Sequence, residues 1–538
     1  MPTGYRSIMK PRVAALAMLA VLVAGCGADA SSTQPSPPPP STGQAGDTPP
    51  PLVPAMPLPD NAVDAAVGRL DELAGDLMRK SGIPGMAVAV VHAGKTAYAK
   101  GFGVKNATLP DDPGNRVDPD TVFQLASVSK SLAATVVAHQ VGVKSVDWNT
   151  PITAKLPWFA LSDPAVTPVV SIGDMMSHRS GLPDHAGDQL EDLGYDRRQV
   201  LEKLRDYPLD PFRISYAYTN FGFTAGAEAA AVAAGKPWED LAADVLFGPL
   251  AMTTASYRYA DYAQRPDRAV GHIRIDDSYQ PRYIRDADAE GPAGGASASV
   301  QDMTHWLAMM LADGSYQGKQ VIDSAALLPA VTPQIVSSPA TEPAMRSGFY
   351  GFGFNVGTTS AARTELSHSG AFELGAGTNV LILPSADVAI VVLTNATPIG
   401  VPETLTAEFA DLVQFGEIRQ DWYGLYRKAF EAMDAPVGSL VGKSPPADPA
   451  APAPLASYAG TYRNDFWGAA TVTERDGRLR LKLGTTLDVE LRHWDGNVFT
   501  FSFVTENAPP GTVSTATFDG DRLTLEYYDA DGKGVFVR

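Results

Sequence analysis

The chain has 538 residues, of which 45% are hydrophobic, so it is long enough for a large folded domain with smaller appendages. Lysine and arginine number 42 against 60 aspartates and glutamates, a formal net charge of −18 at pH 7. This charge argues against non-specific binding to nucleic acid and against attraction to anionic lipid, so no nucleic-acid partner is expected.

The first 25 residues have the features of a segment that is removed during export. A basic start at Arg6, Lys10 and Arg12 precedes an apolar run over residues 13–24, which is too short to span a bilayer. The run ends in LVAGC, which resembles the lipobox of bacterial lipoproteins, where cleavage precedes a cysteine whose thiol is then lipidated. The resemblance implies a signal peptide over residues 1–25 and lipid attachment at Cys26.

An uncleaved anchor helix and a cysteine that is buried by chance are the two alternatives for this segment. Cys26 is the only cysteine, so no intramolecular disulfide can form. If the lipoprotein resemblance holds, more than one acyl chain would anchor the protein stably to a membrane. No aspartate directly follows Cys26, which in a Gram-negative cell implies the outer membrane and a protein that faces the periplasm.

Residues 26–59 are expected to form a lipidated tether. Eleven of the 33 residues in 27–59 are proline, and such a segment cannot bury a core. Fully extended, it would reach at most roughly 100 Å.

The pattern of residues 60–435 predicts one α+β domain, an antiparallel sheet flanked by helices with a helical subdomain. Apolar residues recur at helical spacing from Val63 to Leu77, behind a possible cap at Asp60. Two apolar runs then flank Ala93 and Gly94, which predicts a β-hairpin. Strands at both ends of a helical middle indicate a sheet that joins the start of the domain to its end. Helices are expected near 127–142, 172–177, 198–206, 222–234, 300–312 and 402–433, and strands near 351–356, 378–383 and 388–393.

The last part of the chain is expected to be a linker over residues 436–456 and a small antiparallel β domain over residues 457–538. The linker is rich in proline and alanine. Asp-Gly pairs begin at residues 476, 495, 519 and 531, and this dipeptide between alternating runs is a strong hairpin signal. Leu479, Leu481 and Leu483 alternate along one face of a predicted strand.

Three short motifs carry possible chemistry, and each is weak alone. Ser127 and Lys130 lie one helical turn apart, so the amine could take the proton of the hydroxyl; the alternative is a capping serine and a surface lysine. Tyr218 is a possible base, because an ammonium group beside it in a partly dry pocket would lower its pKa; otherwise it is a core aromatic. Asn220 could hold the lysine or a substrate amide.

The third motif is His368-Ser369-Gly370, just before a predicted strand pair. On an edge strand it would offer backbone N–H and C=O groups to an extended substrate, and otherwise it is a polar strand end. In this order, the three motifs resemble those of the serine β-lactamase and penicillin-binding family, specifically the branch of class C β-lactamases, D-alanyl-D-alanine peptidases and related esterases. The resemblance runs over roughly residues 62–400.

The resemblance implies a β-lactamase-like fold and a serine hydrolase that acts through an acyl-enzyme on an ester or amide, with a peptide containing D-residues as one candidate. It implies that Ser127 is the nucleophile and that Lys130 takes its proton or stabilises Tyr218 as phenolate. Tyr218 would pass a proton to the leaving group. The backbone N–H groups of Ser127 and Ala371 would form the oxyanion hole, and His368 to Gly370 would flank a small-molecule or peptide substrate.

His368 departs from the family pattern, in which a lysine usually stands there. A histidine is mostly neutral at pH 7 and offers no fixed charge to a substrate carboxylate, which weakens the case for efficient β-lactam hydrolysis. A true β-lactamase and a non-catalytic envelope protein that keeps the pocket for binding are the two alternatives.

No cofactor and no metal site are expected. The eight histidines have no zinc-binding spacing, and no cysteine is available to help. His178 and His185 flank a Gly-Leu-Pro turn and are expected to shape a loop. The aromatic residues at 421–426 are expected to pack a helix.

Overall fold

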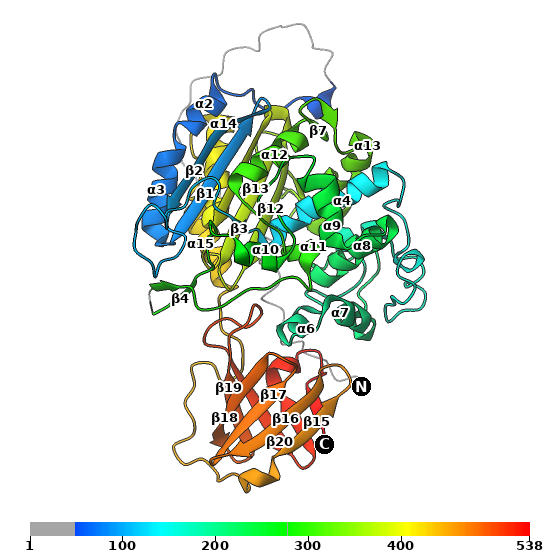
Figure 1. The fold of residues 1–538 in the computed structure, drawn as a ribbon, viewed down its shortest axis with the longest axis vertical. Coiled ribbons are helices and arrows are strands. Elements are labelled where there is room, and N and C mark those ends of the chain that lie inside the picture. The colour runs from blue at the N-terminus through cyan, green and yellow to red at the C-terminus, as the bar shows by residue number, and fades with distance from the viewer. Residues whose placement is uncertain (1–48, 277) are drawn as a thin grey trace.

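The protein is described by a computed structural model that covers residues 49–276 and 278–538. An α+β domain forms the upper part of Figure 1, and a small β-barrel lies below it. Cys26, the predicted signal peptide and most of the tether lie outside these residues. Within the described ranges, no helix combines the length and the apolar character needed to cross a membrane.

An eight-stranded antiparallel sheet forms the centre of the α+β domain. Its order is β2-β1-β14-β13-β12-β11-β10-β9, so the first strand of the domain pairs with the last one, as the sequence predicts. Strands β13 and β14 are buried along their whole length, because helices cover both faces of the sheet. The bounds are β1 Gly85–His92, β2 Lys95–Gly103, β9 Ile335–Ser338, β10 Gly348–Tyr350, β11 Asn355–Thr358, β12 Thr364–Phe372, β13 Ala376–Leu383 and β14 Val388–Thr394.

Helices from the two ends of the domain cover one face of the sheet. These are α2 (Ala62–Val67), α3 (Leu70–Ser81), α14 (Val401–Phe415) and α15 (Trp422–Glu431). The sequence predicts one continuous helix from 63 to 77, whereas the structure has two with a break at Gly68 and Arg69. The expected cap at Asp60 is also wrong, because the residue before α2 is Asn61, whose side chain makes no capping hydrogen bond.

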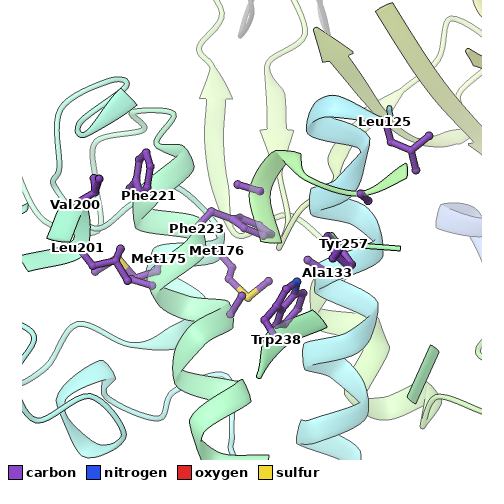
Figure 2. Close-up of a cluster of buried hydrophobic side chains, with 14 of the residues drawn as sticks. Leu125, Ala133, Met175, Met176, Val200, Leu201, Phe221, Phe223, Trp238 and Tyr257 are labelled. Atoms are coloured by element: carbon purple, nitrogen blue, oxygen red, sulfur yellow. The ribbon is translucent and has the colours of Figure 1, made fainter. Parts of the chain in front are cut away.

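The other face carries α12 (Val300–Leu311) and the helical subdomain. Figure 2 shows buried side chains of this subdomain, with Met175 and Phe221 towards Val200 and Leu201, and Met176 and Phe223 towards Trp238. Alanine and glycine dominate α8, which lets its neighbours approach closely and bury these larger side chains. The bounds are α4 Ser129–Gly142, α5 Ile172–Met176, α6 Asp188–Asp192, α7 Arg197–Lys203, α8 Asn220–Ala234, α9 Trp238–Ala242, α10 Tyr259–Gln264, α11 Gly291–Gly294 and α13 Ser324–Leu327.

The strand that the sequence predicts over 351–356 is displaced in the structure, where β10 ends at Tyr350 and β11 begins at Asn355. The residues between them turn against α4 instead. Gly353 approaches so closely that a Cβ there would lie 2.5 Å from the carbonyl oxygen of Lys130. Phe352 and Phe354 are buried on either side of it, so their apolar character reflects a packed turn.

The C-terminal part is a closed barrel of eight antiparallel strands, a closure that the sequence did not indicate. Leu479, Leu481 and Leu483 point into its core, as their alternation predicts. The Asp476-Gly477 pair turns the chain with positive φ angles of 54° and 71°. The bounds are β15 Gly460–Asn464, β16 Gly468–Arg475, β17 Arg478–Leu483, β18 Leu487–Asp495, β19 Val498–Ser502, β20 Val513–Asp519, β21 Arg522–Leu525 and β22 Val535–Val537.

Parts of both proline-rich segments are attached to the folded domains. The backbone N–H of Ala55 donates to the carbonyl of Ala361 at 2.9 Å, so the end of the predicted tether lies against the α+β domain. In the predicted linker, the carbonyl of Val437 accepts from the N–H of Val513 at 2.9 Å. The Ala450 N–H donates to Asp495 at 2.7 Å, so this segment lies along the barrel.

Candidate active site

Ser127 lies in a short 3₁₀ turn, Ala126–Val128, that leads from strand β3 (Phe123–Gln124) into α4. The residue before it, Ala126, has a positive φ of 47°, a conformation that costs a non-glycine residue free energy and that often occurs at functional sites. Two hydrogen bonds fix the preceding Leu125. Its N–H donates to Ala296 at 2.8 Å, and its carbonyl accepts from the hydroxyl of Thr378 at 2.7 Å.

The three side chains on which the sequence interpretation depends meet at one oxygen. The Nζ of Lys130 lies 3.1 Å from the Oγ of Ser127, and the phenol of Tyr218 donates to the same Oγ at 2.8 Å. Tyr218 lies 91 positions away in the sequence. The fold therefore places an amine and a phenol within hydrogen-bond distance of one serine hydroxyl.

Lys130 is completely buried, and this burial sets its chemistry. Desolvation lowers the pKa of Lys130 to about 7, against the charges of Glu290 and Asp188, which raise it. Its Nζ also lies 2.6 Å from Asn220 Oδ1 and 3.0 Å from the carbonyl of Ala293. At neutral pH a large fraction of Lys130 is therefore uncharged, held in place and able to accept a proton.

The pKa of Tyr218 shifts in the opposite direction to that of Lys130. Burial raises its pKa well above the ordinary value, against the hydrogen bond with Ser127, which lowers it. The sequence predicts a lowered pKa beside an ammonium group, and this prediction is wrong because desolvation outweighs the hydrogen bond with Ser127. The Lys130 Nζ lies 4.6 Å from the centre of the Tyr218 ring, over its face. The phenol therefore remains protonated and is suited to donate a proton.

Asn220 is the first residue of α8 and connects Lys130 to an acidic residue behind it. Its Nδ2 donates to Asp188 Oδ2 at 3.0 Å, and that oxygen also lies 2.7 Å from Nδ1 of His185. Burial lowers the pKa of His185, but the contact with Asp188 outweighs it and raises the pKa. His185 thus belongs to the loop that supports Asn220.

The His368-Ser369-Gly370 motif lies on β12, beside Ser127. The ladder between β11 and β12 reaches Ser367, so residues 368–372 pair with β13 alone and have one free edge. Gly370 allows this strand to approach Ser127, because a Cβ there would lie 2.3 Å from the carbonyl oxygen of Leu125 and 3.0 Å from the Ser127 nitrogen. Ala371 follows directly on the same edge.

His368 is buried and neutral. Desolvation, together with the charge of Lys130, lowers its pKa to about 3. Its Nε2 lies 2.9 Å from the hydroxyl of Tyr350, and its Nδ1 lies 2.7 Å from the carbonyl of Ser369. It therefore offers no positive charge to a substrate carboxylate.

Two further rings belong to the site, although the sequence assigns His178 only to a loop and does not indicate Tyr350. The His178 ring packs 4.4 Å from the ring of Tyr218 and 4.9 Å from the ring of Tyr350. Its Nδ1 accepts the backbone N–H of Thr219 at 3.1 Å, which orients the tyrosine and asparagine on either side. His178 has a positive φ of 58°, an unusual backbone conformation that can be seen in the structure but not in the sequence.

The barrel contributes a side chain to the edge of the site, which no pattern in the sequence indicates. Glu506, in the loop between β19 and β20, accepts the backbone N–H of Glu373 at 2.8 Å and that of Leu374 at 3.4 Å, just after β12. It also lies 3.5 Å from Nε of Arg285, a buried arginine that pairs with Glu191 at 2.8 Å and Glu290 at 2.7 Å.

A second attachment lies on the same barrel loop. The hydroxyl of Thr505 donates to Asp192 of α6 at 2.7 Å, and the side-chain amide of Asn507 donates to the same carboxylate at 3.0 Å. Helix α6 also carries Asp188, which holds Asn220. The barrel loop therefore connects the helical side of the site to the sheet side.

A cavity adjoins Tyr218 and the His368-Ser369-Gly370 motif. Tyr218, His368 and Ser369 line it together with residues of β11, α14 and α15. It has about 90 Å³ of space for the centres of water molecules, several times the roughly 10–15 Å³ that one water requires. Among the described residues, no group of three or more histidine, cysteine, aspartate or glutamate side chains is arranged to hold a metal ion.

Comparison with known proteins gives two family matches. Residues 70–415 match the family model described as "Beta-lactamase", and residues 444–533 match a "Domain of unknown function (DUF3471)". The chain is 27% identical over 329 residues to "Unguisins hydrolase ungD'" of Aspergillus campestris, covering 59% of each protein. This alignment thus spans less than two thirds of that relative.

Two further relatives are matched over more of their length. "Unguisins hydrolase ungD" of Aspergillus violaceofuscus is 25% identical, with 86% of this chain and 87% of the relative covered. "Penicillin-binding protein 4" of Amycolatopsis lactamdurans is 27% identical, with 71% and 94% covered. An octameric penicillin-binding protein homologue from Pyrococcus abyssi has a similar fold, with a TM-score of 0.57, 16% identity, and 88% and 100% of the two chains covered.

Proposed function

Because the chain belongs to the beta-lactamase family and is a serine hydrolase, we propose that it cleaves an ester or amide bond through an acyl-enzyme on Ser127. One observation carries this proposal: the Oγ of Ser127 lies within hydrogen-bond distance of both Lys130 and Tyr218. Relatives named as an esterase and as a D-alanyl-D-alanine-carboxypeptidase support either an ester or a peptide substrate.

In the first step, neutral Lys130 takes the proton of Ser127 while the serine oxygen bonds to the substrate carbonyl carbon. Lys130 is the better first base, because its pKa is about 7 whereas that of Tyr218 is raised well above 10. The carbonyl oxygen becomes an oxyanion, which the N–H groups of Ser127 and Ala371 stabilise from the two facing segments.

The tetrahedral intermediate then breaks. The bond between carbonyl carbon and leaving group cleaves, and the Tyr218 phenol gives its proton to the departing oxygen or nitrogen. The Lys130 ammonium then gives its proton to the Tyr218 phenolate, so both groups are neutral again. In the second half of the reaction, water attacks the acyl-enzyme, its proton passes to the same basic pair, and Ser127 is released with the acid product.

A fluorophosphonate probe tests the proposal. The full-length protein should be labelled at Ser127, and Ser127→Ala should abolish labelling. Ser131→Ala is the matched control, because its hydroxyl lies one turn further along α4 and donates to Gly353 instead. A folded wild-type protein that does not react with the probe would favour the alternative of a non-catalytic binding protein.

A true β-lactamase is the second alternative, and neutral His368 argues against it. A chromogenic cephalosporin separates the two, because efficient turnover would favour the β-lactamase. His368→Lys should raise the activity on this anionic substrate relative to that on a neutral ester if the missing charge is what limits it.

We further propose that the enzyme works in the cell envelope, attached by lipid at Cys26, and in a Gram-negative cell on the periplasmic side of the outer membrane. The support is the sequence of residues 1–26. Metabolic labelling with a fatty acid should mark the wild-type chain and not Cys26→Ser. Labelling of both would disprove lipid attachment at this cysteine.

A further inference from the structure

The cavity beside the catalytic residues has an acidic wall. Glu365 comes from β12, and Glu403 and Asp411 come from α14, while the described residues that line the cavity include no lysine and no arginine. Tyr426 also lines the cavity, and burial first, then the charges of all three carboxyl groups, raise its pKa. Three acidic side chains thus surround one small space.

Glu403 carries an atom with unused hydrogen-bonding capacity. The residue is only 4% exposed, and its Oε2 has no hydrogen-bond partner. Its place in the first turn of α14 explains part of its role, because an acid there complements the helix dipole. A buried carboxylate oxygen is costly to leave unpaired, and Glu403 lines the cavity, so its Oε2 indicates a missing donor.

The burial of these acids indicates that the missing donor is positively charged. Desolvation is the main cause that raises the pKa of Glu365 and of Glu403 to about 7. A positive group in the cavity would compensate both carboxylates. The rings of Tyr216, Tyr350 and Trp422 also line the space, and aromatic rings attract alkylammonium groups.

The position of the cavity relates it to one side of the scissile bond. Tyr218, the proton donor to the leaving group, lines it together with His368 and Ser369, whereas Gly370 and Ala371 at the oxyanion position do not. The hydroxyl of Ser369 accepts from Asn379 at 2.9 Å and lies close to Glu403, so the motif itself borders the acidic wall.

We propose that this cavity, with Glu403 and Glu365, binds an alkylammonium group on the leaving-group side of the substrate. The inference rests on the proposed function and specifies its substrate: an ester or amide whose alcohol or amine portion carries a positive charge. Neutral His368 and the acidic wall together disfavour a carboxylate at that place.

Two esters of the same acid test the proposal. Butyrylcholine and 3,3-dimethylbutyl butyrate have leaving groups of the same shape, one cationic and one neutral, and both form the same acyl-enzyme. A difference in kcat/KM therefore arises in binding and acylation. We expect the full-length enzyme to prefer the choline ester by roughly tenfold, within the range of a desolvated contact with aromatic rings and a carboxylate.

Glu403→Gln and Glu365→Gln should each reduce this preference for the choline ester severalfold. Glu408→Gln is the matched control, because Glu408 lies on the same helix and outside the cavity lining. Labelling of Ser127 by the fluorophosphonate probe shows that each variant has a working site.

A wild-type enzyme that labels at Ser127 and hydrolyses the neutral ester at least as well as the choline ester would overturn this inference and leave the proposed function standing. A preference that both glutamine variants retain would also overturn it. If Ser127 does not label in the folded wild-type protein, the proposed function fails and the inference fails with it.

Discussion

Nζ of Lys130 lies closer to Asn220 Oδ1, at 2.6 Å, than to Ser127 Oγ, at 3.1 Å. A neutral amide therefore provides the nearest acceptor for this buried amine, and none of the described carboxylates lies as close to compensate a positive charge. This explains why desolvation controls the pKa of Lys130 and lowers it to about 7.

The first prediction concerns pH. Below pH 7 Lys130 is mostly protonated and cannot take the serine proton, so kcat/KM for a neutral ester should rise as the pH increases through about 7. His368, with a pKa of about 3, should add no transition between pH 5 and 9. A pH profile measured with a neutral ester checks this, and a flat profile over that range would contradict Lys130 as the base.

Asn220→Asp should move this transition. The change keeps the size of the side chain and places a negative charge 2.6 Å from the amine, which favours the ammonium form and raises the pKa of Lys130. We expect the midpoint of kcat/KM to shift upward by about one pH unit or more. The control is Asn497→Asp, in the barrel and remote from the site, which should leave the midpoint where it is.

Tyr218→Phe removes the proposed proton donor and keeps the ring that packs on His178. Activity on an alkyl ester or an amide should fall by roughly 10²–10⁴-fold, the usual contribution of general acid catalysis. A nitrophenyl ester should lose much less, because its leaving group departs without a proton. Equal losses on both substrates would show that Tyr218 acts in some other way.

Asp174 should be a large contributor to stability. It is completely buried and accepts from Arg179 at 2.8 Å and from Arg213 at 2.8 Å, and with Ser171 it caps α5. Asp174→Ala leaves two arginines without their carboxylate and should lower the free energy of unfolding by roughly 3–5 kcal/mol in urea titration. Glu72→Gln, which breaks an exposed pair with Arg69, should cost about 1 kcal/mol or less.

The stability from Asp174 depends on pH in a defined direction. Burial raises its pKa, but the hydrogen bonds from Arg213 and Arg179 outweigh this, so the folded-state pKa lies below 3.8. Its contribution is therefore fully present above pH 3.8 and is lost as the pH falls through the folded-state value. The difference between wild type and Asp174→Ala should accordingly narrow in strong acid.

Glu506 should affect the active site from the barrel. Glu506→Ala removes the acceptor for two backbone N–H groups after β12, and each unsatisfied buried group costs about 1–3 kcal/mol. We expect a lower unfolding temperature and a lower kcat/KM, since the turn that follows Ala371 loosens. Glu490→Gln, in an exposed pair of the same barrel, should change neither. A normal kcat/KM in Glu506→Ala would mean that the contact is only structural.

The parts of the site that lie close to a sequence motif could be predicted. Ser127 and Lys130 are neighbours on one turn, and the order of the three motifs indicated that Tyr218 and His368 would join them. The buried group around Arg285 could not be predicted, because Glu191, Glu290 and Glu506 come from remote segments and follow no spacing.

In the fold, too, the elements that a local pattern marks could be predicted, and those that depend on remote contacts could not. Strands β1, β13 and β14 were predictable because long apolar runs mark strands that are buried on both faces. The barrel closes through the single pair of Arg463 and Val537 between its first and last strands, a contact that no local pattern records. The break at Gly68 and the turn at Phe352 also depend on tertiary packing.

The attachment of Glu506 also has a consequence for the order in which the molecule is made. A ribosome finishes Ser127, Lys130, Tyr218 and the whole of β12 well before residue 506 emerges. A nascent chain that stops short of the barrel loop carries every reacting group but leaves the end of β12 without its two acceptor bonds. The two hydrogen bonds that complete the end of β12 therefore form only after the barrel loop has been synthesised.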